Sequence, residues 1–399
     1  MPSVLKTAPK VKKSEHASAT SGYFVLLFLM GVFCAFGLMM VLSSSSVDSL
    51  RIYGSSWVFF KRQVIWIILG AIALYSTLRI DYQFWRKWRM PLLAVSAGLL
   101  FIVLIPGIGI KVSGSRRWLG MGALNMQPSE LAKFAMLVFA ADLLARRQHL
   151  LSDWRVGLAP VGAVFLGFAF LIMLEPDMGT TMVMGAVTVS VLFVSGIPLK
   201  YLARGGAGVV AAATFLAIVE PYRRARLLSF THPFDDAAGG GYQVVQSIIG
   251  IGSGGLTGVG LGASKSKWGF LPNAHTDFIF AIIAEELGLI GAVVVVGMFI
   301  AFACVGIRTA TRAPDQFGAL LAAGITSWVV FQAFLNLGAV IGVLPVTGVP
   351  LPFLSQGGSS LVVLMAATGI LANVAKQGEM APSRKRVGHR TARGASGVH

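Results

Sequence analysis

The chain has 399 residues, of which 55% are hydrophobic and 12% are charged, and its mean hydropathy is +0.76. So few charges exclude an ordinary soluble domain, where about 25% of residues are charged, and indicate a protein that crosses a membrane several times. The net charge of +17 does not indicate nucleic-acid binding, because the basic residues are spread over loops and tails, where membrane topology and anionic lipids account for them.

Apolar segments that approach the ~20 residues needed to cross a bilayer predict an all-α, polytopic integral membrane protein with about ten transmembrane helices. In chain order these segments cover residues 23–42, 64–78, 91–105, 129–144, 158–174, 180–194, 205–219, 278–307, 317–343 and 359–374. If the N-terminus is inside, Lys and Arg are about twice as frequent in the inner segments as in the outer loops. Both termini are therefore expected to be cytoplasmic.

Polar, basic tails flank the predicted membrane domain, which spans residues 23–376. Residues 1–22 and 377–399 contain few apolar side chains and are expected to be disordered in the cytoplasm. Two outer loops, 106–128 and 220–276, are longer than a simple connection requires, and long loops in compact domains are usually functional. The larger, extracytoplasmic loop immediately precedes the eighth predicted helix.

Within this large loop, residues 242–251 are expected to form an interfacial helix. The following segment, 252–262, is too rich in glycine for a stable helix and is expected to be a flexible or re-entrant segment packed against protein. It contains a G-x-G-x-x-G spacing, but no strand–turn–helix pattern surrounds it, so dinucleotide binding is rejected.

Asp277 is the leading candidate for a functional residue. It lies where the large loop meets a long apolar run, and ionisable side chains at or inside a bilayer are costly and usually mark function. The same position suits a helix N-cap formed by Thr276 or Asp277, so capping and chemistry are both open from the residues alone. His275 is either a partner of this carboxylate or an interfacial imidazole.

Two further acids, Glu285 and Glu286, follow inside the apolar run. At about 100° per residue, Glu285 lies about 80° around the helix from Asp277, whereas Glu286 lies on the opposite face. A tight metal cage of three carboxylates is therefore not expected. Each glutamate is instead expected to be paired or protonated within the helix bundle.

Charged residues near the outer face offer groups that could meet an anion. Glu130 and Lys133 are i,i+3 neighbours at the start of a predicted helix, so they can form a structural ion pair. Lys133 could also supply positive charge to an anionic substrate. Arg116 and Arg117 precede a tryptophan in an outer loop, where they either bind phosphate in a bidentate fashion or hold the loop at the interface.

Two outer segments contain features of less obvious purpose. Glu175 and Asp177 lie in a tight turn on either side of a proline. Residues 345–360 join the last two predicted helices, and their three prolines fix an extended path while the glycines allow close approach of backbone. In this segment Ser355 and Gln356 precede two glycines, and Ser359 is expected to cap the last helix.

Several of these segments occur together, in the same order, in the SEDS family (shape, elongation, division and sporulation) of bacterial polytopic glycosyltransferases, which the chain resembles over about residues 20–376. The resemblance rests on Arg116-Arg117-Trp118, Gln127-Pro128-Ser129-Glu130, Glu175-Pro176-Asp177-Met178-Gly179-Thr180, His275-Thr276-Asp277-Phe278-Ile279-Phe280, Glu285-Glu286-Leu287-Gly288 and Pro350-Leu351-Pro352-Phe353. Residues 262–267 and the basic tails resemble the division branch, FtsW, more than the elongation branch, RodA. The chain departs from the family at Gln356, where tyrosine is usual, and at Lys265-Ser266-Lys267, where glutamine commonly precedes the lysine.

This resemblance implies that the protein polymerises lipid II into glycan strands at the outer face of the cytoplasmic membrane, with Asp277 as the general base. The residues expected to bind substrate or neutralise its pyrophosphate are Arg116, Arg117, Lys133, Ser264, Lys267 and His275. The residues expected to support them are Glu130, Glu285, Glu286, Ser355 and Ser359. No covalently bound cofactor is expected; a divalent cation, Mg²⁺ or Mn²⁺, could assist at the pyrophosphate, and its ligands are unknown.

The resemblance also implies where and with what the protein works. The expected partners are a class B penicillin-binding transpeptidase of the FtsI type, a division activator complex of FtsQ-, FtsL- and FtsB-like proteins, and membrane lipids, with no nucleic acid. The expected location is the division septum of a bacterial cytoplasmic membrane. Two alternatives are a lipid II flippase, which needs a path through the membrane but no base, and a non-catalytic division scaffold.

Overall fold

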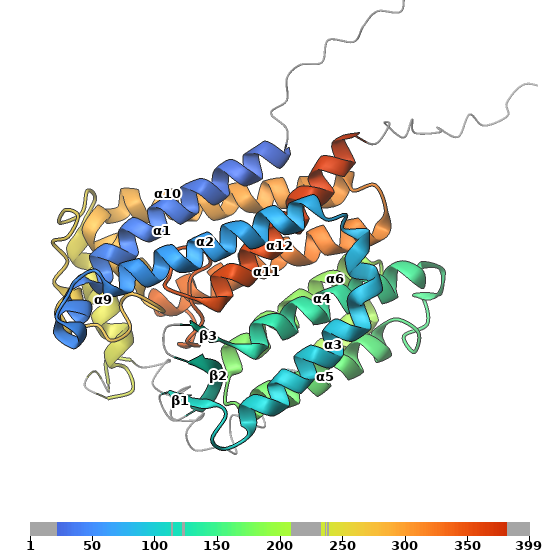
Figure 1. Ribbon diagram of the computed structural model, residues 1–399, viewed down its shortest axis with the longest axis horizontal. Coiled ribbons are helices and arrows are strands. Elements are labelled where there is room, and N and C mark those ends of the chain that lie inside the picture. The colour runs from blue at the N-terminus through green and yellow to red at the C-terminus, as the bar shows by residue number, and fades with distance from the viewer. Residues whose placement is uncertain are drawn as a thin grey trace, which may run out of the picture.

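The computed structural model of the chain describes residues 22–112, 115–121, 124–208, 233–235, 237 and 239–380, and this part is mostly helical (Figure 1). The helix predicted at 205–219 lies largely outside the described residues. Most of the two predicted tails, and much of the first half of the large loop, also lie outside them.

The other predicted membrane helices coincide with helices of the structure. Their bounds are Gly22–Tyr53 for α1, Val58–Arg79 for α2, Gln83–Leu104 for α3, Pro128–Arg146 for α4, Leu158–Leu174 for α5, Met178–Val194 for α6, Ile279–Arg312 for α10, Gln316–Val340 for α11 and Ser359–Met380 for α12. Within the described residues, six helices are long and apolar enough to span a membrane, and α5 and α6 are shorter apolar helices. A polytopic membrane protein is confirmed, whereas the total of about ten helices stays a prediction.

Helix α1 shows why several helices are longer than their apolar segments predicted. Beyond its apolar part, the hydroxyl of Ser45 donates to the carbonyl of Val41 at 2.6 Å and that of Ser46 donates to the carbonyl of Ser43 at 3.0 Å. These local bonds satisfy the polar side chains without ending the helix. A hydropathy pattern therefore finds the lipid-facing part of a helix and misses its polar end.

The outer loop at 106–128 corrects the all-α prediction, because it forms a small antiparallel sheet. Its strands are β1 (Ile110–Val112), β2 (Ser115–Met121) and β3 (Leu124–Met126), in the order β1-β2-β3. The outer strands are too short for an alternating apolar pattern to reveal them, so the segment was predicted as loop.

The helices run roughly along one another, which gives the molecule two distinct ends (Figure 1). Helix α9 (Tyr242–Gly254), the predicted interfacial helix, and the small sheet lie at one end. The start of α1 and the end of α12 lie at the other end, where the N–H of Gly22 donates to Glu379 Oε1 at 2.7 Å. The loop that follows α9 and enters α10 carries Asp277, so this residue belongs to the end opposite to those two helix termini.

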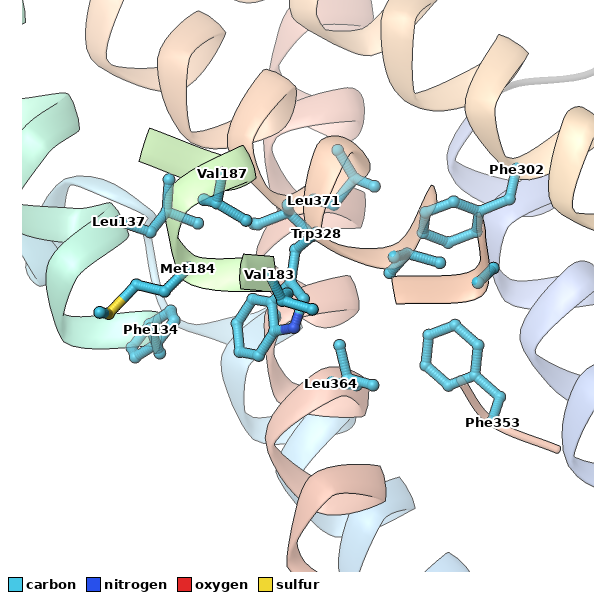
Figure 2. Close-up of a cluster of buried hydrophobic side chains, with 14 of the residues drawn as sticks. Phe134, Leu137, Val183, Met184, Val187, Phe302, Trp328, Phe353, Leu364 and Leu371 are labelled. Carbon is cyan, nitrogen blue, oxygen red and sulfur yellow. The ribbon is translucent and has the colours of Figure 1, made fainter. Parts of the chain in front are cut away.

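The centre of the bundle is packed around Trp328 of α11, which is fully buried (Figure 2). Around it lie Val183 and Val187 of α6 and Leu364 and Leu371 of α12. Lipid is as apolar as these side chains, so close packing rather than exclusion from water holds such helices together. This packing fixes the relative positions of the helices whose starts build the candidate site.

Helix α10 is broken at Gly288, whose φ of 66° and ψ of −163° are not helical. The glycine-rich segment after α9 lies against this break: the N–H of Val259 donates to the carbonyl of Glu285, and the N–H of Leu289 donates to the carbonyl of Gly255. Backbone polar groups inside a membrane protein must be satisfied by protein, and here the loop and the helix satisfy each other. Residues 255–260 therefore pack against protein as predicted, whereas residues 252–254, which were expected to be too rich in glycine for a helix, continue α9.

Substituting Gly288 with alanine is expected to destabilise the protein strongly. A Cβ at this position would overlap the backbone of Leu256 and Gly258, and its positive φ disfavours any L side chain, which costs of order 1–3 kcal/mol by itself. In the matched control, Gly297→Ala, the new Cβ meets nothing within 4 Å, so the same helix should be unchanged or slightly more stable. Thermal unfolding in detergent compares the two; equal midpoints would contradict this account of the break.

Candidate active site

Asp277 is half-buried in the turn that leads into α10. The N-cap position of that helix is Phe278, so Asp277 does not occupy the capping position that its place in the sequence allowed. The carboxylate lies against Gly348 in the segment that joins α11 to α12: a Cβ on this glycine would be 3.7 Å from Asp277 Oδ2. A glycine here leaves space beside the carboxylate that any other residue would take.

The backbone of Asp277 is held by Asn336, a buried residue of α11. The Nδ2 group of Asn336 donates to the carbonyl of Asp277 at 2.7 Å and to the carbonyl of Val349 at 2.8 Å. One amide thus joins the turn before α10 to the segment after α11. Since both bonds go to the main chain, they position the residue without engaging its carboxylate.

Ser355 adds a second bridge between the same two segments. Its hydroxyl donates to the carbonyl of Thr276 at 2.6 Å and accepts from the N–H of Leu351 at 2.9 Å. Beside it, the N–H of Gln356 donates to the carbonyl of His275 at 3.1 Å. Three consecutive carbonyls, from residues 275 to 277, are therefore fixed from outside the turn, which fits the supporting role predicted for Ser355.

The imidazole of His275 packs toward α1 and α2. It stacks on Phe59 with ring centroids 4.9 Å apart, and its Nδ1 lies 3.7 Å from Asp48 Oδ2. Burial lowers the pKa of His275, while the neighbouring Asp48 opposes that shift. The ring is thus a packed, neutral group at neutral pH in this structure, and its contact with substrate stays a prediction.

The predicted pair of Glu130 and Lys133 is confirmed. Lys133 Nζ lies 2.9 Å from Glu130 Oε1, and both side chains are almost completely buried. The ammonium also lies 4.9 Å from the centre of the Trp328 ring and 3.4 Å from Gln332 Oε1. Gln332 in turn donates to the carbonyl of Pro350 at 3.0 Å, so the pair connects through α11 to the segment that borders Asp277.

Glu285 and Glu286 are both buried, and both accept hydrogen bonds from the end of the large loop, which agrees with the expectation that each is paired or protonated. Ser264 donates to Glu285 Oε2 at 2.6 Å, and Lys267 lies 3.1 Å from Glu286 Oε1. The hydroxyl of Ser43 of α1 lies 2.7 Å from both oxygens of Glu286 and shares its one hydrogen between them. Although the two glutamates are adjacent and diverge on the helix, the loop wraps around and meets both of them.

Ser264 and Lys267 belong to this buried cluster and are not exposed to the substrate side. Both were expected to meet the substrate, yet each is at most 4% exposed and engaged with a glutamate. Their visible contribution is to fasten the end of the large loop to α1 and α10. Direct contact with a pyrophosphate stays a prediction and would require the ion pair of Lys267 to open.

Arg116 and Arg117 lie on β2 and are half-buried. Arg117 donates from Nε to the carbonyl of Glu175 at 2.9 Å and from Nη2 to the carbonyl of Pro176 at 2.5 Å. The guanidinium therefore holds the turn before α6 in place, and no carboxylate of the described residues forms an ion pair with it. Phosphate binding by either arginine stays a prediction.

Asp177 explains part of the acidic turn whose purpose the sequence left open. It caps α6, accepting from the N–H of Thr180 at 3.0 Å, and it also accepts from Gln127 Nε2 at 2.8 Å. The N–H of Gln127 donates to the hydroxyl of Ser359 at 3.0 Å. Ser359 therefore joins the start of α12 to the start of α4, instead of capping its own helix as predicted.

Four helix N-termini consequently meet around residues 345–358. Those of α4, α6 and α12 are joined through Gln127, and that of α10 follows Asp277 beside Gly348. Gly179, in the first turn of α6, packs so closely on Thr347 that a Cβ there would overlap it. Helix N-termini carry partial positive charge and unpaired N–H groups, so their convergence favours an anion at this end of the molecule.

Glu175 remains as a buried acid in this region, and neither of its carboxylate oxygens has a hydrogen-bond partner among the described residues. Burial and the neighbouring Asp177 raise its pKa to about 8, while Arg117 opposes the shift. Glu175 is therefore mostly protonated at neutral pH when the protein is folded. In the unfolded chain it loses its proton near its ordinary value of 4.5.

The stability of the protein is therefore expected to depend on pH through Glu175. Between about pH 4.5 and 8 the folded state holds a proton that the unfolded state releases, so rising pH should progressively destabilise the fold and then have no further effect. Glu175→Gln should remove this part of the pH dependence and be the more stable protein above pH 8. Thermal midpoints from pH 5 to 9 decide this, and parallel curves for the two proteins would contradict it.

The described residues do not offer a ready-made metal site. Among them, no three His, Cys, Asp or Glu side chains are placed to hold an ion together. Asp277 supplies one carboxylate, whereas Mg²⁺ normally takes one or two carboxylates together with water and substrate phosphates. The described residues therefore form no complete site for a resident metal, and an ion beside Asp277 would need substrate phosphates and water as further ligands.

Two positioning residues, Gln332 and Asn336, were missed by the sequence reasoning. Both are almost completely buried in α11 and both bond the segment after it. They are four residues apart, so they lie on one face of a mostly apolar helix. Polar side chains inside a membrane helix usually mark function, so the spacing of these two residues in the sequence could have identified them as candidates.

Comparison with known proteins agrees with this architecture. The profile of the FtsW/RodA/SpoVE family, described as a cell cycle protein, matches residues 24–380. Stage V sporulation protein E of Bacillus subtilis is 40% identical over 358 residues, covering 90% of this chain and 98% of that protein. The probable peptidoglycan glycosyltransferase FtsW of Mycobacterium tuberculosis is 41% identical over 368 residues, covering 92% of this chain and 70% of that protein.

Solved structures show the same fold. A chain from a peptidoglycan synthase complex that coordinates polymerization and crosslinking matches with a TM-score of 0.76 and 28% identity, covering 90% of this chain and 98% of that one. The rod shape determining protein RodA of Thermus thermophilus matches with a TM-score of 0.66 and 27% identity, covering 89% of this chain and 96% of that one. The chain belongs to the FtsW/RodA/SpoVE family.

Proposed function

We propose that this protein is a peptidoglycan glycosyltransferase that polymerises lipid II, with Asp277 as the general base. The observation that supports this most is the placement of Asp277: a half-buried carboxylate, fixed through its backbone, at a point where four helix N-termini converge. Relatives about 40% identical over nearly the whole matched domain carry the name of that activity. The site contains a group that can take a proton and a field that favours an anion.

The reaction follows from these two properties. The acceptor 4-hydroxyl oxygen attacks the anomeric carbon of the donor sugar, whose bond to the pyrophosphate oxygen breaks with inversion. The hydroxyl proton goes to Asp277, which needs to be within hydrogen-bond reach of it. The departing lipid pyrophosphate is already a good leaving group, and the helix N-termini together with Arg116, Arg117 and Lys133 offset its charge. A Mg²⁺ or Mn²⁺ ion, if present, would arrive bound to that pyrophosphate.

The proposed setting is the outer face of a bacterial cytoplasmic membrane. Both termini would be cytoplasmic, since α1 starts and α12 ends at the end of the molecule opposite to Asp277. By analogy with the family, a class B transpeptidase and FtsQ-, FtsL- and FtsB-like activators would be partners at the septum. The basic tails would recruit or localise the protein from the cytoplasmic side.

The test is direct reconstitution with substrate. The purified full chain, with its transpeptidase partner, is mixed with fluorescent lipid II, and glycan strands are resolved on a gel. A polymerase yields strands. A flippase would move lipid II across a vesicle membrane without polymer, and a scaffold would do neither, so each of these results would replace the proposal.

A further inference from the structure

A pocket of about 400 Å³ lies at the end of the molecule opposite to Asp277, and the proposed reaction does not use it. It is formed between the start of α1, the end of α2 and the end of α12. Its apolar lining comes from Leu27, Leu74 and Leu78, and tyrosines 23 and 75 border it. The volume lies in the range of pockets that hold small molecules or part of a lipid.

The same pocket is bordered by two cations, Arg79 and Lys376, and by no carboxylate among the described residues. Neither cation forms an ion pair with an acid of the described residues. Asp81 accepts from the N–H of Gln83 at 2.8 Å, and Glu379 accepts from the N–H of Gly22 at 2.7 Å. Two positive charges thus face an apolar pocket without a partner acid.

Arg79 is also held in place. Its Nη2 donates to the hydroxyl of Tyr75 at 2.8 Å, and its guanidinium carbon lies 4.9 Å from the centre of the Tyr75 ring. An arginine has five N–H donors in a planar fork that matches phosphate oxygens. With one donor used by Tyr75, the others are available to a phosphate.

The chain's own tails do not complement this pocket. The N-terminal tail, which leads into α1 beside the pocket, contains Lys6, Lys10, Lys12 and Lys13, and the tail after α12 is rich in Lys and Arg. Their charge has the same sign as Arg79 and Lys376. The complementary occupant has a negative charge and an apolar chain.

We infer that this pocket binds one anionic glycerophospholipid of the inner leaflet. The headgroup phosphate lies between Arg79 and Lys376, and the upper part of an acyl chain lies against the three leucines. Basic pockets between transmembrane helices on the cytoplasmic side are suited to such headgroups. The site is separate from the substrate end and does not depend on the proposed reaction.

Native mass spectrometry of the purified full chain, titrated with phosphatidylglycerol, tests the inference. The double variant Arg79→Gln/Lys376→Gln is expected to bind the first lipid about thirtyfold more weakly, because each basic residue at the surface contributes to holding an anionic headgroup. Leu27→Trp leaves both charges in place, fills the pocket, and should weaken binding as well. Phosphatidylcholine should be retained poorly by all of these proteins.

The matched control is Lys200→Gln/Arg204→Gln, which removes two exposed cations elsewhere on the proposed cytoplasmic side, one of them also beside a tyrosine. It should bind phosphatidylglycerol like the unaltered chain. Equal losses in this control and the double variant, or unaltered binding by Leu27→Trp, would overturn the inference. Displacement of the lipid by millimolar inorganic phosphate, or much tighter lipid binding after deletion of residues 1–21, would point to a free-anion site or to a tail as occupant and would also overturn it.

Discussion

Asp277→Asn is expected to abolish glycan polymerisation while expression, folding and lipid II binding survive. Asparagine has nearly the same shape, and the bonds from Asn336 and Ser355 go to main-chain carbonyls that the substitution leaves in place. The side chain can no longer take a proton, and loss of a general base typically lowers the rate by about 10²–10⁴-fold. The rate of strand formation from lipid II, with the thermal midpoint measured in parallel, provides the test.

The matched control for this variant is Asp235→Asn, which removes an exposed acid from the same large loop. It should polymerise lipid II like the unaltered protein. Near-normal polymerisation by Asp277→Asn would refute the role of this residue as base. A loss of activity that accompanies an equally large loss of stability would instead assign Asp277 to the fold.

Breaking the buried pair of Glu130 and Lys133 should produce the largest loss of stability. Lys133→Met leaves the Glu130 carboxylate buried without its ion-pair partner. Glu130→Gln likewise leaves the Lys133 ammonium buried without a carboxylate. Removing one member of a buried ion pair typically costs about 3–5 kcal/mol, whereas removing both is far less destabilising. The double variant should therefore recover most of the stability.

Activity is expected to follow a different pattern in these three variants. Lys133 is linked through Gln332 to the carbonyl of Pro350, so its charge is part of the wall beside Asp277. The double variant should recover stability but not polymerisation. The interaction energy between the two substitutions should therefore differ when it is calculated from unfolding and from the polymerisation rate. The control Arg146→Met removes a half-exposed cation from the other end of α4, where Asp142 keeps two further arginines. Full activity in the double variant would leave the pair with a structural role only.

Sequence reasoning located most of the fold because hydropathy directly reports which segments face lipid. The same reasoning selected Asp277 as a candidate, since acids at the threshold of an apolar run are costly and usually mark function, but from the residues alone it could equally have been a helix cap. The small sheet was missed because strands of three residues carry no periodic signal. Helix bounds were short wherever a polar stretch such as 43–49 continued a membrane helix.

The site itself was predicted less well, because its assembly depends on contacts between distant segments. Helical angles placed Glu285 and Glu286 on different faces, which is correct for the helix but does not reveal that a loop contacts both of them. Burial of Lys267 was likewise invisible from the sequence, where a lysine in an outer loop reads as solvent-exposed. Gln332 and Asn336 could have been identified, since their spacing on one face of an apolar helix is a local pattern.

The three fixed carbonyls of residues 275–277 have a consequence for how substitutions act in this turn. Their partners contact atoms that all twenty amino acids share, so the path of the turn is largely indifferent to which side chains it presents. Tolerance to replacement there should then report what the side chain does rather than whether the protein folds. Natural variation or laboratory evolution could therefore replace a side chain in this turn while its backbone keeps the same position.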